Sequence, residues 1–369
     1  MTHFHTSPAS QPRFSRDSGS VSLHLSPYLS PSMDPSFEPF PESSQILNDR
    51  YRIIQVLGRG GFGVSALAKD YQLPSHPYCV IKQLCPLSQA PDVLERARWR
   101  FQREAKTLAQ LGSHAQIPLL LNYFEKQGRF FLVQEFIPGK TLTQLVKEGI
   151  PWKESQVIEF LEAILPVIGY VHRQGVIHRD IKPSNIIRCQ SDDRFVLLDF
   201  GAVKSVLNSE ETTSHSTVQF VGTNGFAPVE QRQLRPCFAS DLYALGMTSL
   251  FLLTGQWPQA FPFDRSSQKV QWEKFVTVSK PMAVLLTHLL HPDLAQRYRS
   301  AEDVLKAIQI MQALQHKTQN NTQNKNQNKT RGNDRLPDSR SQEKYVDLKD
   351  CLHTQSPKRR FGSRSLWEK

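Results

Sequence analysis

The chain is poor in cysteine and has no long apolar run, and each absence excludes a class of protein. The five cysteines are scattered, with no Cys-x-x-Cys pair among Cys79, Cys85, Cys189, Cys237 and Cys351. This pattern predicts reduced thiols, a cytoplasmic location and no zinc site. No apolar run reaches the roughly 18 residues of a membrane span, and the run at 242–253 fits a buried helix better. The first residues also lack the basic start and apolar stretch of a secretory signal, so we expect no membrane span.

Both ends of the chain lack the periodic apolar residues that a folded core requires. Residues 1–45 are rich in Ser and Pro, and residues 318–330 are almost entirely Asn, Gln, Lys and Thr. Segments of this kind bury too little apolar surface to offset the entropy lost on ordering. We therefore expect disordered tails at 1–48 and 316–369.

The formal net charge of +11 is concentrated toward the C-terminal end. Residues 317–369 carry 13 basic and 6 acidic side chains, whereas residues 1–49 carry 2 and 5. The basic cluster Lys358–Arg360 suits an acidic partner, a phosphate backbone or an anionic lipid surface, although a solvated charged terminus explains it as well. No RNA- or DNA-binding fingerprint accompanies this tail, so we expect no specific nucleic acid partner.

The segment His178–Asn185 (HRDIKPSN) carries the strongest chemical signal in the chain. Its carboxylate, ammonium group and carboxamide stand at the spacing where phosphoryl transfer needs a base, a cation that neutralises phosphate charge (a charge clamp) and a metal ligand. Further along, Asp199–Gly201 (DFG) follows the apolar run 195–198. This pattern predicts a strand whose end presents a second carboxylate. Together the two segments indicate phosphoryl transfer.

The segment Gly58–Gly63 (GRGGFG), with glycines of the motif at Gly58, Gly60 and Gly63, lies between two strand-like stretches, 51–57 and 65–69. This context predicts a hairpin turn and excludes a dinucleotide-binding fold, which needs a helix directly after the glycines. The Gly-Lys-Ser/Thr ending of a P-loop is also missing. Because glycine has no Cβ, its backbone amide can approach a phosphate closely. A glycine-rich hairpin without a ligand is the alternative.

These motifs stand in the order found in the protein kinase family, together with Cys79–Lys82 (CVIK) and Pro228–Glu230 (PVE). Over about residues 50–312 the chain resembles a bacterial, eukaryotic-like serine/threonine kinase. The resemblance implies an α+β, two-lobed protein kinase fold. Its small antiparallel-sheet lobe, with one regulatory helix, is expected at 49–137, and its larger, mainly helical lobe at 138–315. The breaker pair at 138–139 agrees with this boundary.

The resemblance also implies the catalytic roles. Asp180 would accept or orient the proton of the substrate hydroxyl, and Lys182 would neutralise charge on the γ-phosphoryl group. Lys82 would clamp the α- and β-phosphates and pair with Glu104, with Glu95 as the alternative partner. The lysine two positions after the base is the serine/threonine form of this loop.

ATP and Mg²⁺ are the implied cofactors, with Mn²⁺ as the alternative ion. Asn185 and Asp199 would hold the metal through hard oxygen ligands. By resemblance, Gln134 occupies the gatekeeper position behind the adenine site. Ser65 stands where the family usually has Val, which predicts a more polar surface above the adenine ring. The implied nucleotide-binding residues are Leu57, Gly58, Gly60, Gly61, Phe62, Gly63, Ser65, Val80, Lys82, Glu135, Ile137 and Ile187.

Arg179, next to the base, predicts coupling to a phosphorylated loop through Arg–phosphate bonds. The loop at 202–227 is rich in hydroxyl groups, and we expect autophosphorylation at one or more of Thr212, Thr213, Ser214, Ser216 and Thr217. A merely polar loop is the alternative. Thr223 resembles the threonine that positions the base rather than regulates it.

Three further residues are expected to be structural. Val229 replaces the family's proline, which predicts a looser loop anchor. By resemblance, Glu230 would pair with Arg297, and Asp241 would brace the backbone of the catalytic loop.

The function expected from the sequence is that of a non-specific serine/threonine protein kinase. Such an enzyme transfers the γ-phosphoryl group of ATP to hydroxyls of protein substrates, itself among them, and acts as a cytoplasmic phosphoprotein in signal transduction. A pseudokinase or nucleotide-binding scaffold is the first alternative, and a nucleic-acid or membrane-surface binder that uses the basic tail is the second.

Overall fold

The computed structural model describes residues 46–60, 63–84, 91–205 and 221–314. The chain divides into two units, 1–313 and 314–369, and every described residue except Leu314 belongs to the first. Residues 1–45, the predicted tail 316–369, Gly61, Phe62 and the five candidate phosphorylation sites lie outside the described residues. The last residues of the predicted N-terminal tail are described, and Ile46–Leu47 form a short strand instead of disordered chain.

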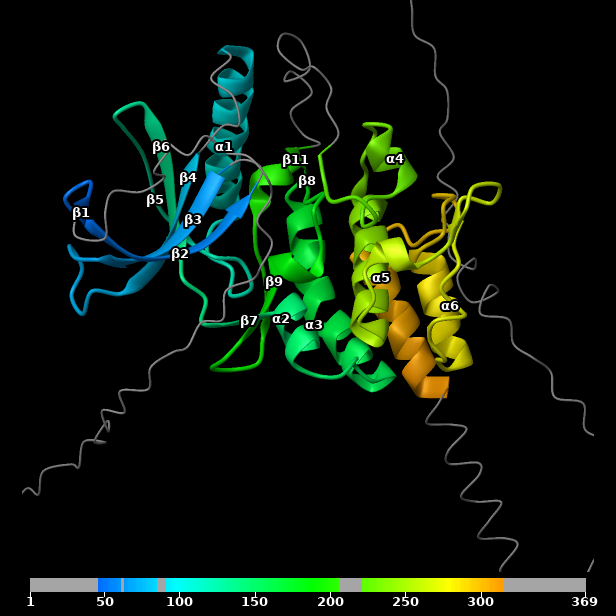
Figure 1. Ribbon diagram of the computed structural model, residues 1–369. Helices are drawn as coiled ribbons and strands as arrows, with labels where there is room; N and C mark the ends of the chain where they lie inside the picture. Colours follow the sequence, from blue (N-terminus) through cyan, green and yellow to red (C-terminus); the bar gives the residue numbers. More distant parts are fainter. Residues whose placement is uncertain (1–45, 61–62, 85–90, 206–220, 315–369) are drawn as a thin grey trace, which may run out of the picture. The chain divides into compact units, whose positions relative to one another are not determined.

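The N-terminal part of the fold is an antiparallel sheet of six strands with one long helix. The strand order is β1-β2-β3-β4-β6-β5, and helix α1 (Pro91–Leu111) packs against β4, β5 and β6 (Figure 1). The strands are β1 (Ile46–Leu47), β2 (Tyr51–Gly60), β3 (Gly63–Asp70), β4 (Tyr78–Leu84), β5 (Leu120–Lys126) and β6 (Arg129–Glu135).

The C-terminal part is mainly helical. Its helices are α2 (Leu142–Glu148), α3 (Glu154–Arg173), α4 (Val229–Arg232), α5 (Phe238–Thr254), α6 (Lys280–Leu289) and a last helix over 301–314, with 3-10 turns η1 (Pro183–Asn185), η2 (Phe200–Ala202) and η4 (Pro258–Ala260). Its short strands form the groups β10-β9-β7 (Phe195–Leu197, Ile186–Cys189 and Gly139–Thr141), β11-β8 (Lys204–Ser205 and Val176–Ile177) and β12-β13 (Phe263–Asp264 and Lys269–Val270). The predicted α+β architecture is confirmed.

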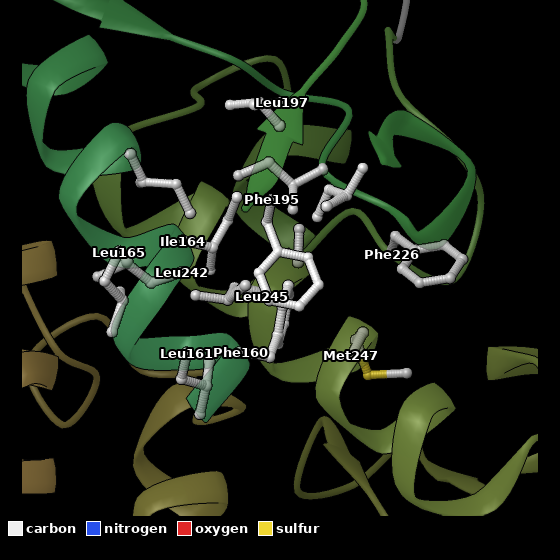
Figure 2. Close-up of a cluster of buried hydrophobic side chains, with 14 of the residues drawn as sticks. Phe160, Leu161, Ile164, Leu165, Phe195, Leu197, Phe226, Leu242, Leu245 and Met247 are labelled. Carbon is white, nitrogen blue, oxygen red and sulfur yellow. The ribbon is translucent and has the colours of Figure 1, made fainter. Parts of the chain in front are cut away.

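Helices α3 and α5 form the centre of the larger core. Apolar residues of α3 recur at helical spacing, so one face of the helix is buried, whereas α5 is apolar on all sides and buried almost throughout. Figure 2 shows their side chains around strand β10, where the ring of Phe160 meets the edge of Phe195 at a centroid distance of 5.1 Å. Each large side chain buried in this way stabilises the fold by about 1.5–3 kcal/mol.

This core fixes the two segments that carry the chemical motifs. Helix α3 ends at Arg173 and leads through β8 into His178, and β10 ends two residues before Asp199. Strand β8 pairs with β11, which follows the Asp199 segment. Both motifs therefore begin directly after elements anchored in the core.

Within the described residues, no helix combines the length and apolar character needed to cross a membrane. The apolar run 242–253 lies inside α5, in the core, as predicted. Cys79 and Cys189 are buried free thiols, and burial raises the pKa of Cys79 to about 12. That thiol is a core residue rather than a reactive one. The cytoplasmic location stays a prediction.

Candidate active site

The carboxylate of Asp180 lies at the centre of a small polar cluster. Thr223 Oγ1 donates to Asp180 Oδ1 at 2.6 Å, and Lys182 Nζ lies 2.7 Å from Asp180 Oδ2. Lys182 Nζ also donates to Thr223 Oγ1 at 2.7 Å. The Asn185 carboxamide donates to the Asp180 carbonyl at 2.9 Å and to Oδ2 at 3.1 Å. The base, the charge clamp and the carboxamide predicted from the sequence are thus brought together, with Thr223 between two of them.

Asp241 of α5 holds the backbone that carries this cluster. Its buried carboxylate accepts hydrogen bonds from the amides of His178 and Arg179 and lies against His172 Nε2, each at 2.8 Å. Arg179 has a positive φ of 66°, a conformation that costs energy for a residue with a side chain and persists only when its surroundings impose it. Burial opposes ionisation of Asp241, but the hydrogen bond and charge of His172 outweigh it and lower the pKa of Asp241.

His172 is part of this brace and was not predicted. It stands in the last turn of α3, only six residues before His178. A histidine at a helix C-terminus just before the catalytic motif was the available signal.

A second ionic cluster joins β4, α1 and the Asp199 segment. Lys82 Nζ lies 2.5 Å from Glu104 Oε1 and 3.1 Å from Asp199 Oδ1. Glu104 is 5% exposed, whereas Glu95 is exposed, so Glu104 is the partner. Burial disfavours the Lys82 cation, but the charges of Asp199 and Glu104 outweigh it and raise the pKa of Lys82 above its usual value. The charge of Lys82 in turn lowers the pKa of Asp199 to about 2.

The imidazole of His178 ties the two motifs to each other. Its Nδ1 accepts the Asp180 amide at 3.3 Å, which leaves Nε2 as the protonated atom that donates to the Leu198 carbonyl at 3.0 Å. The Leu198 amide donates to the Asn185 carbonyl at 2.8 Å. Asp199, the next residue, adopts a left-handed conformation with φ 64°. Asn185 and Asp199 are therefore held on adjacent segments.

The two predicted metal ligands offer hard oxygen atoms, the kind that Mg²⁺ prefers. The Asp199 side chain is 44% exposed. Asn185 uses its nitrogen for Asp180, and its oxygen has a long contact of 3.5 Å with Ser184 Oγ, which leaves a lone pair for a cation. Among the described residues no group of three or more His, Cys, Asp or Glu side chains is arranged for a metal. The pair therefore fits an ion that takes its remaining ligands from water and substrate phosphates, as Mg²⁺ does in sites of this kind.

Gly63 and Gly58 of the predicted phosphate loop have different surroundings. A Cβ on Gly63 would lie 2.1 Å from the Gln83 carbonyl oxygen of β4, so only glycine fits between these strands. A Cβ on Gly58 would meet no atom within 4 Å. Gly63 is thus explained by strand packing, and open space beside Gly58 leaves its backbone accessible to a ligand.

The residues predicted to enclose adenine come from five strands and the segment after β6. Val80 pairs with Gln134 across β4 and β6, and Gln134 is buried. Buried Ile137 belongs to a small cluster against which Ile187 of β9 is packed. Leu57 precedes Gly58, which pairs with Ser65, and Ser65 pairs in turn with Lys82. Glu135 pairs with Cys79, three positions before Lys82 on β4. Their role in nucleotide binding stays a prediction.

The loop that follows Asp199 is anchored at both of its described ends. The guanidinium group of Arg179 donates to the carbonyls of Ala202 and Val203, the second at 2.9 Å. At the far end, Arg297 Nη1 donates to Glu230 Oε1 at 2.6 Å, which is the pair expected from the sequence.

Comparison with known proteins places this site in a family. The protein kinase domain family matches residues 51–369, and the chain therefore belongs to the protein kinases.

Two cyanobacterial relatives are similar over the same region. Serine/threonine-protein kinase B of Synechocystis sp. is 46% identical over 269 residues, which cover 72% of this chain and 47% of that protein. Serine/threonine-protein kinase PknA of Nostoc sp. is 42% identical and covers 72% and 48%. The chain thus spans about half the length of these curated relatives.

A solved structure agrees on the fold. The crystal structure of the Mycobacterium tuberculosis PknI kinase domain matches with a TM-score of 0.55 and 22% identity, over 73% of this chain and 98% of that one.

Proposed function

We propose that this protein transfers the γ-phosphoryl group of ATP to serine or threonine hydroxyls of protein substrates. The observation that supports this most is the cluster of Asp180, Lys182, Asn185 and Thr223, in which one carboxylate is fixed by three side chains. Such an arrangement suits a hydroxyl that must lose a proton as its oxygen attacks phosphorus.

The substrate hydroxyl oxygen forms a bond to the γ-phosphorus, the bond from that phosphorus to the β–γ bridging oxygen breaks, and ADP leaves. The Asp180 carboxylate orients the hydroxyl and takes its proton. Lys182, beside Asp180, neutralises charge on the transferring group, and Lys82 does so at the α- and β-phosphates. Thr223 keeps Lys182 and Asp180 in one geometry.

We propose Mg²⁺ as the metal, held by Asn185 and Asp199. When bound, it would supply positive charge at the phosphates. The expected result is activity with Mg²⁺, loss on chelation with EDTA, and restoration by added Mg²⁺. Activity that persists in EDTA would contradict the assignment.

The Lys82–Glu104 ion pair supports an active enzyme rather than a nucleotide-binding scaffold. This pair and the Asp199 carboxylate are both in place, and a kinase needs them together for phosphoryl transfer. The decisive experiment is transfer of labelled phosphate from ATP to a generic basic protein. We expect Asp180→Ala to lower the rate by about 10²–10⁴-fold, while Asp192→Ala, at an exposed carboxylate, leaves it unchanged. Equal transfer by the Asp180 variant would refute the proposal.

Autophosphorylation belongs to the same proposal. The contacts of Arg179 with Ala202 and Val203 place its guanidinium group at the start of the hydroxyl-rich loop, where a loop phosphate would find a cation. Mass spectrometry after incubation with ATP should find phosphate at one or more of Thr212, Thr213, Ser214, Ser216 and Thr217. An active enzyme with an unmodified loop would exclude it.

A further inference from the structure

Two neighbouring residues of helix α4 make contacts in different directions. Glu230 binds Arg297 and Ser240 in the helical core. The next side chain, Gln231, is 3% exposed and contacts the active site instead. Its Nε2 donates to the Arg179 carbonyl at 2.6 Å and to the Val221 carbonyl at 2.9 Å. One short helix thus joins the core to the catalytic loop.

The two carbonyls that Gln231 binds lie next to the reacting groups. Arg179 directly precedes Asp180, and Val221 stands two residues before Thr223. The peptide unit between Arg179 and Asp180 is held at both ends, since its oxygen accepts from Gln231 and its N–H donates to His178 Nδ1. The position of this peptide sets where the Asp180 side chain begins.

Gly222 makes this approach sterically possible. Its φ is 132°, and a Cβ there would lie 2.5 Å from Gln231 Nε2 and 2.9 Å from the Arg179 carbonyl oxygen. Any other residue would displace the carboxamide or the catalytic loop. The catalytic loop at Arg179, the glycine at 222 and the Gln231 side chain therefore pack closely against one another at one contact.

The contact suits a carboxamide. The nitrogen of glutamine carries two hydrogens, so it can donate a separate hydrogen bond to each of the two carbonyl oxygens. An ionised glutamate carries none and would place a negative charge between two carbonyl oxygens. A methionine has a similar length and no donor.

We propose that Gln231 is a positioning residue for the protein substrate: its carboxamide keeps the Asp180 loop in register with the Val221–Thr223 segment. The inference rests on the proposed phosphoryl transfer and deepens it. It assigns to Gln231 the alignment of base and acceptor hydroxyl. Of the groups proposed to hold ATP and its metal, Lys182 and Asn185 belong to this loop, and the others come from Lys82, Asp199 and the strands. Loss of the carboxamide should therefore impair transfer to a peptide far more than nucleotide binding.

The test compares Gln231→Met and Gln231→Glu in the full chain with Gln233→Met, a control at an exposed glutamine of the same segment. We measure kcat and KM for a serine-containing peptide, and the affinity for ATP without peptide by displacement of a fluorescent nucleotide. Both Gln231 variants should lose at least about tenfold in kcat/KM for the peptide, because misplacement by a fraction of an ångström is costly in such steps. Affinity for ATP should stay within about twofold, and the control should match the wild type in both.

The pH dependence of Gln231→Glu separates positioning from simple packing. A protonated glutamic acid regains one donor, and burial between carbonyls raises the pKa of such a group. The ratio of kcat/KM for Gln231→Glu to that of the wild type should rise as the pH falls from about 8 to about 6, and the ratio for Gln231→Met should stay flat.

Three outcomes would overturn the inference: unchanged kcat/KM in both variants, an equal loss of ATP affinity, or lower thermal stability as the only effect. An inactive wild type would instead refute the proposed function itself, so the two failures are distinguishable.

Discussion

Removal of one charge from the Glu230–Arg297 pair should destabilise the fold strongly. The Arg297 side chain is 0% exposed and that of Glu230 is 10% exposed. Arg297 also donates to the carbonyls of His291 and Ala239, at 2.8 and 3.1 Å. Glu230→Gln keeps the size of the side chain but leaves the guanidinium group buried without a counter-charge, since carbonyl dipoles compensate a full charge only in part.

The expected cost of Glu230→Gln is about 3–5 kcal/mol in the free energy of unfolding, the usual penalty for a buried charge that loses its partner. In a folded region of this size, about 1 kcal/mol corresponds to about 2–4 °C, so the melting temperature should fall by about 6–20 °C. Glu302→Gln is the matched control, because the Arg173–Glu302 pair is exposed, with side chains 61% and 48% accessible. That variant should lose no more than about 1 kcal/mol.

Urea unfolding of Glu230→Gln, Arg297→Met and the double variant tests this reasoning. The double variant should cost less than the sum of the single ones, because no uncompensated charge remains in it. A loss below about 1 kcal/mol for Glu230→Gln, or strictly additive losses, would show that the pair behaves like an exposed one.

Two further predictions concern the ionic groups of the site. Lys82→Met should lower phosphoryl transfer to a protein substrate by about 10²–10³-fold, the usual effect of removing one group that stabilises developing charge. It should also destabilise the fold, because the buried Glu104 carboxylate loses its partner; a second substitution, Glu104→Gln, should restore stability but not activity. A normal rate for Lys82→Met would refute the proposed contact of Lys82 with the phosphates. Asp241→Asn should lower the free energy of unfolding at pH 7, and its difference from the wild type should shrink at low pH. The pKa of Asp241 is lower in the folded than in the unfolded state. The ionised carboxylate therefore stabilises the fold fully above about pH 4, and this effect is lost as the pH falls through the folded-state pKa. Urea midpoints for both proteins at several pH values measure this, and a constant difference would contradict it.

The sequence was sufficient to predict the architecture and to pick out candidate site residues that the structure brings together. Asp180, Lys182 and Asn185 are close in the chain, so their spacing alone puts them on one loop. Lys82 and Glu104 are 22 positions apart, yet each falls in an element whose type was readable, a strand and a helix. Thr223 could be assigned because it lies in a motif of its own.

What the sequence could not provide is contact geometry between distant segments. The bond from Gln231 to the Arg179 carbonyl spans 52 positions and follows from no motif. The reason for Gly63 was also hidden, because the Gln83 carbonyl that excludes a Cβ there belongs to another strand. The phosphate-loop pattern alone suggested only closeness to a ligand.

The substitution at Val229 bears on how firmly the loop is anchored. Proline is the usual family residue here, which led us to expect a looser anchor. In the structure Val229 is the first residue of α4 and follows Pro228, its N-cap. The amide of a first helical residue has no partner within the helix, so proline, which lacks an N–H, would lose no helical hydrogen bond there, and valine gains none. The remaining difference is the greater freedom of the unfolded chain, about 0.4–1 kcal/mol. Because removal of one partner from the buried Glu230–Arg297 pair costs several times as much, the anchor is more sensitive to these two residues than to Val229.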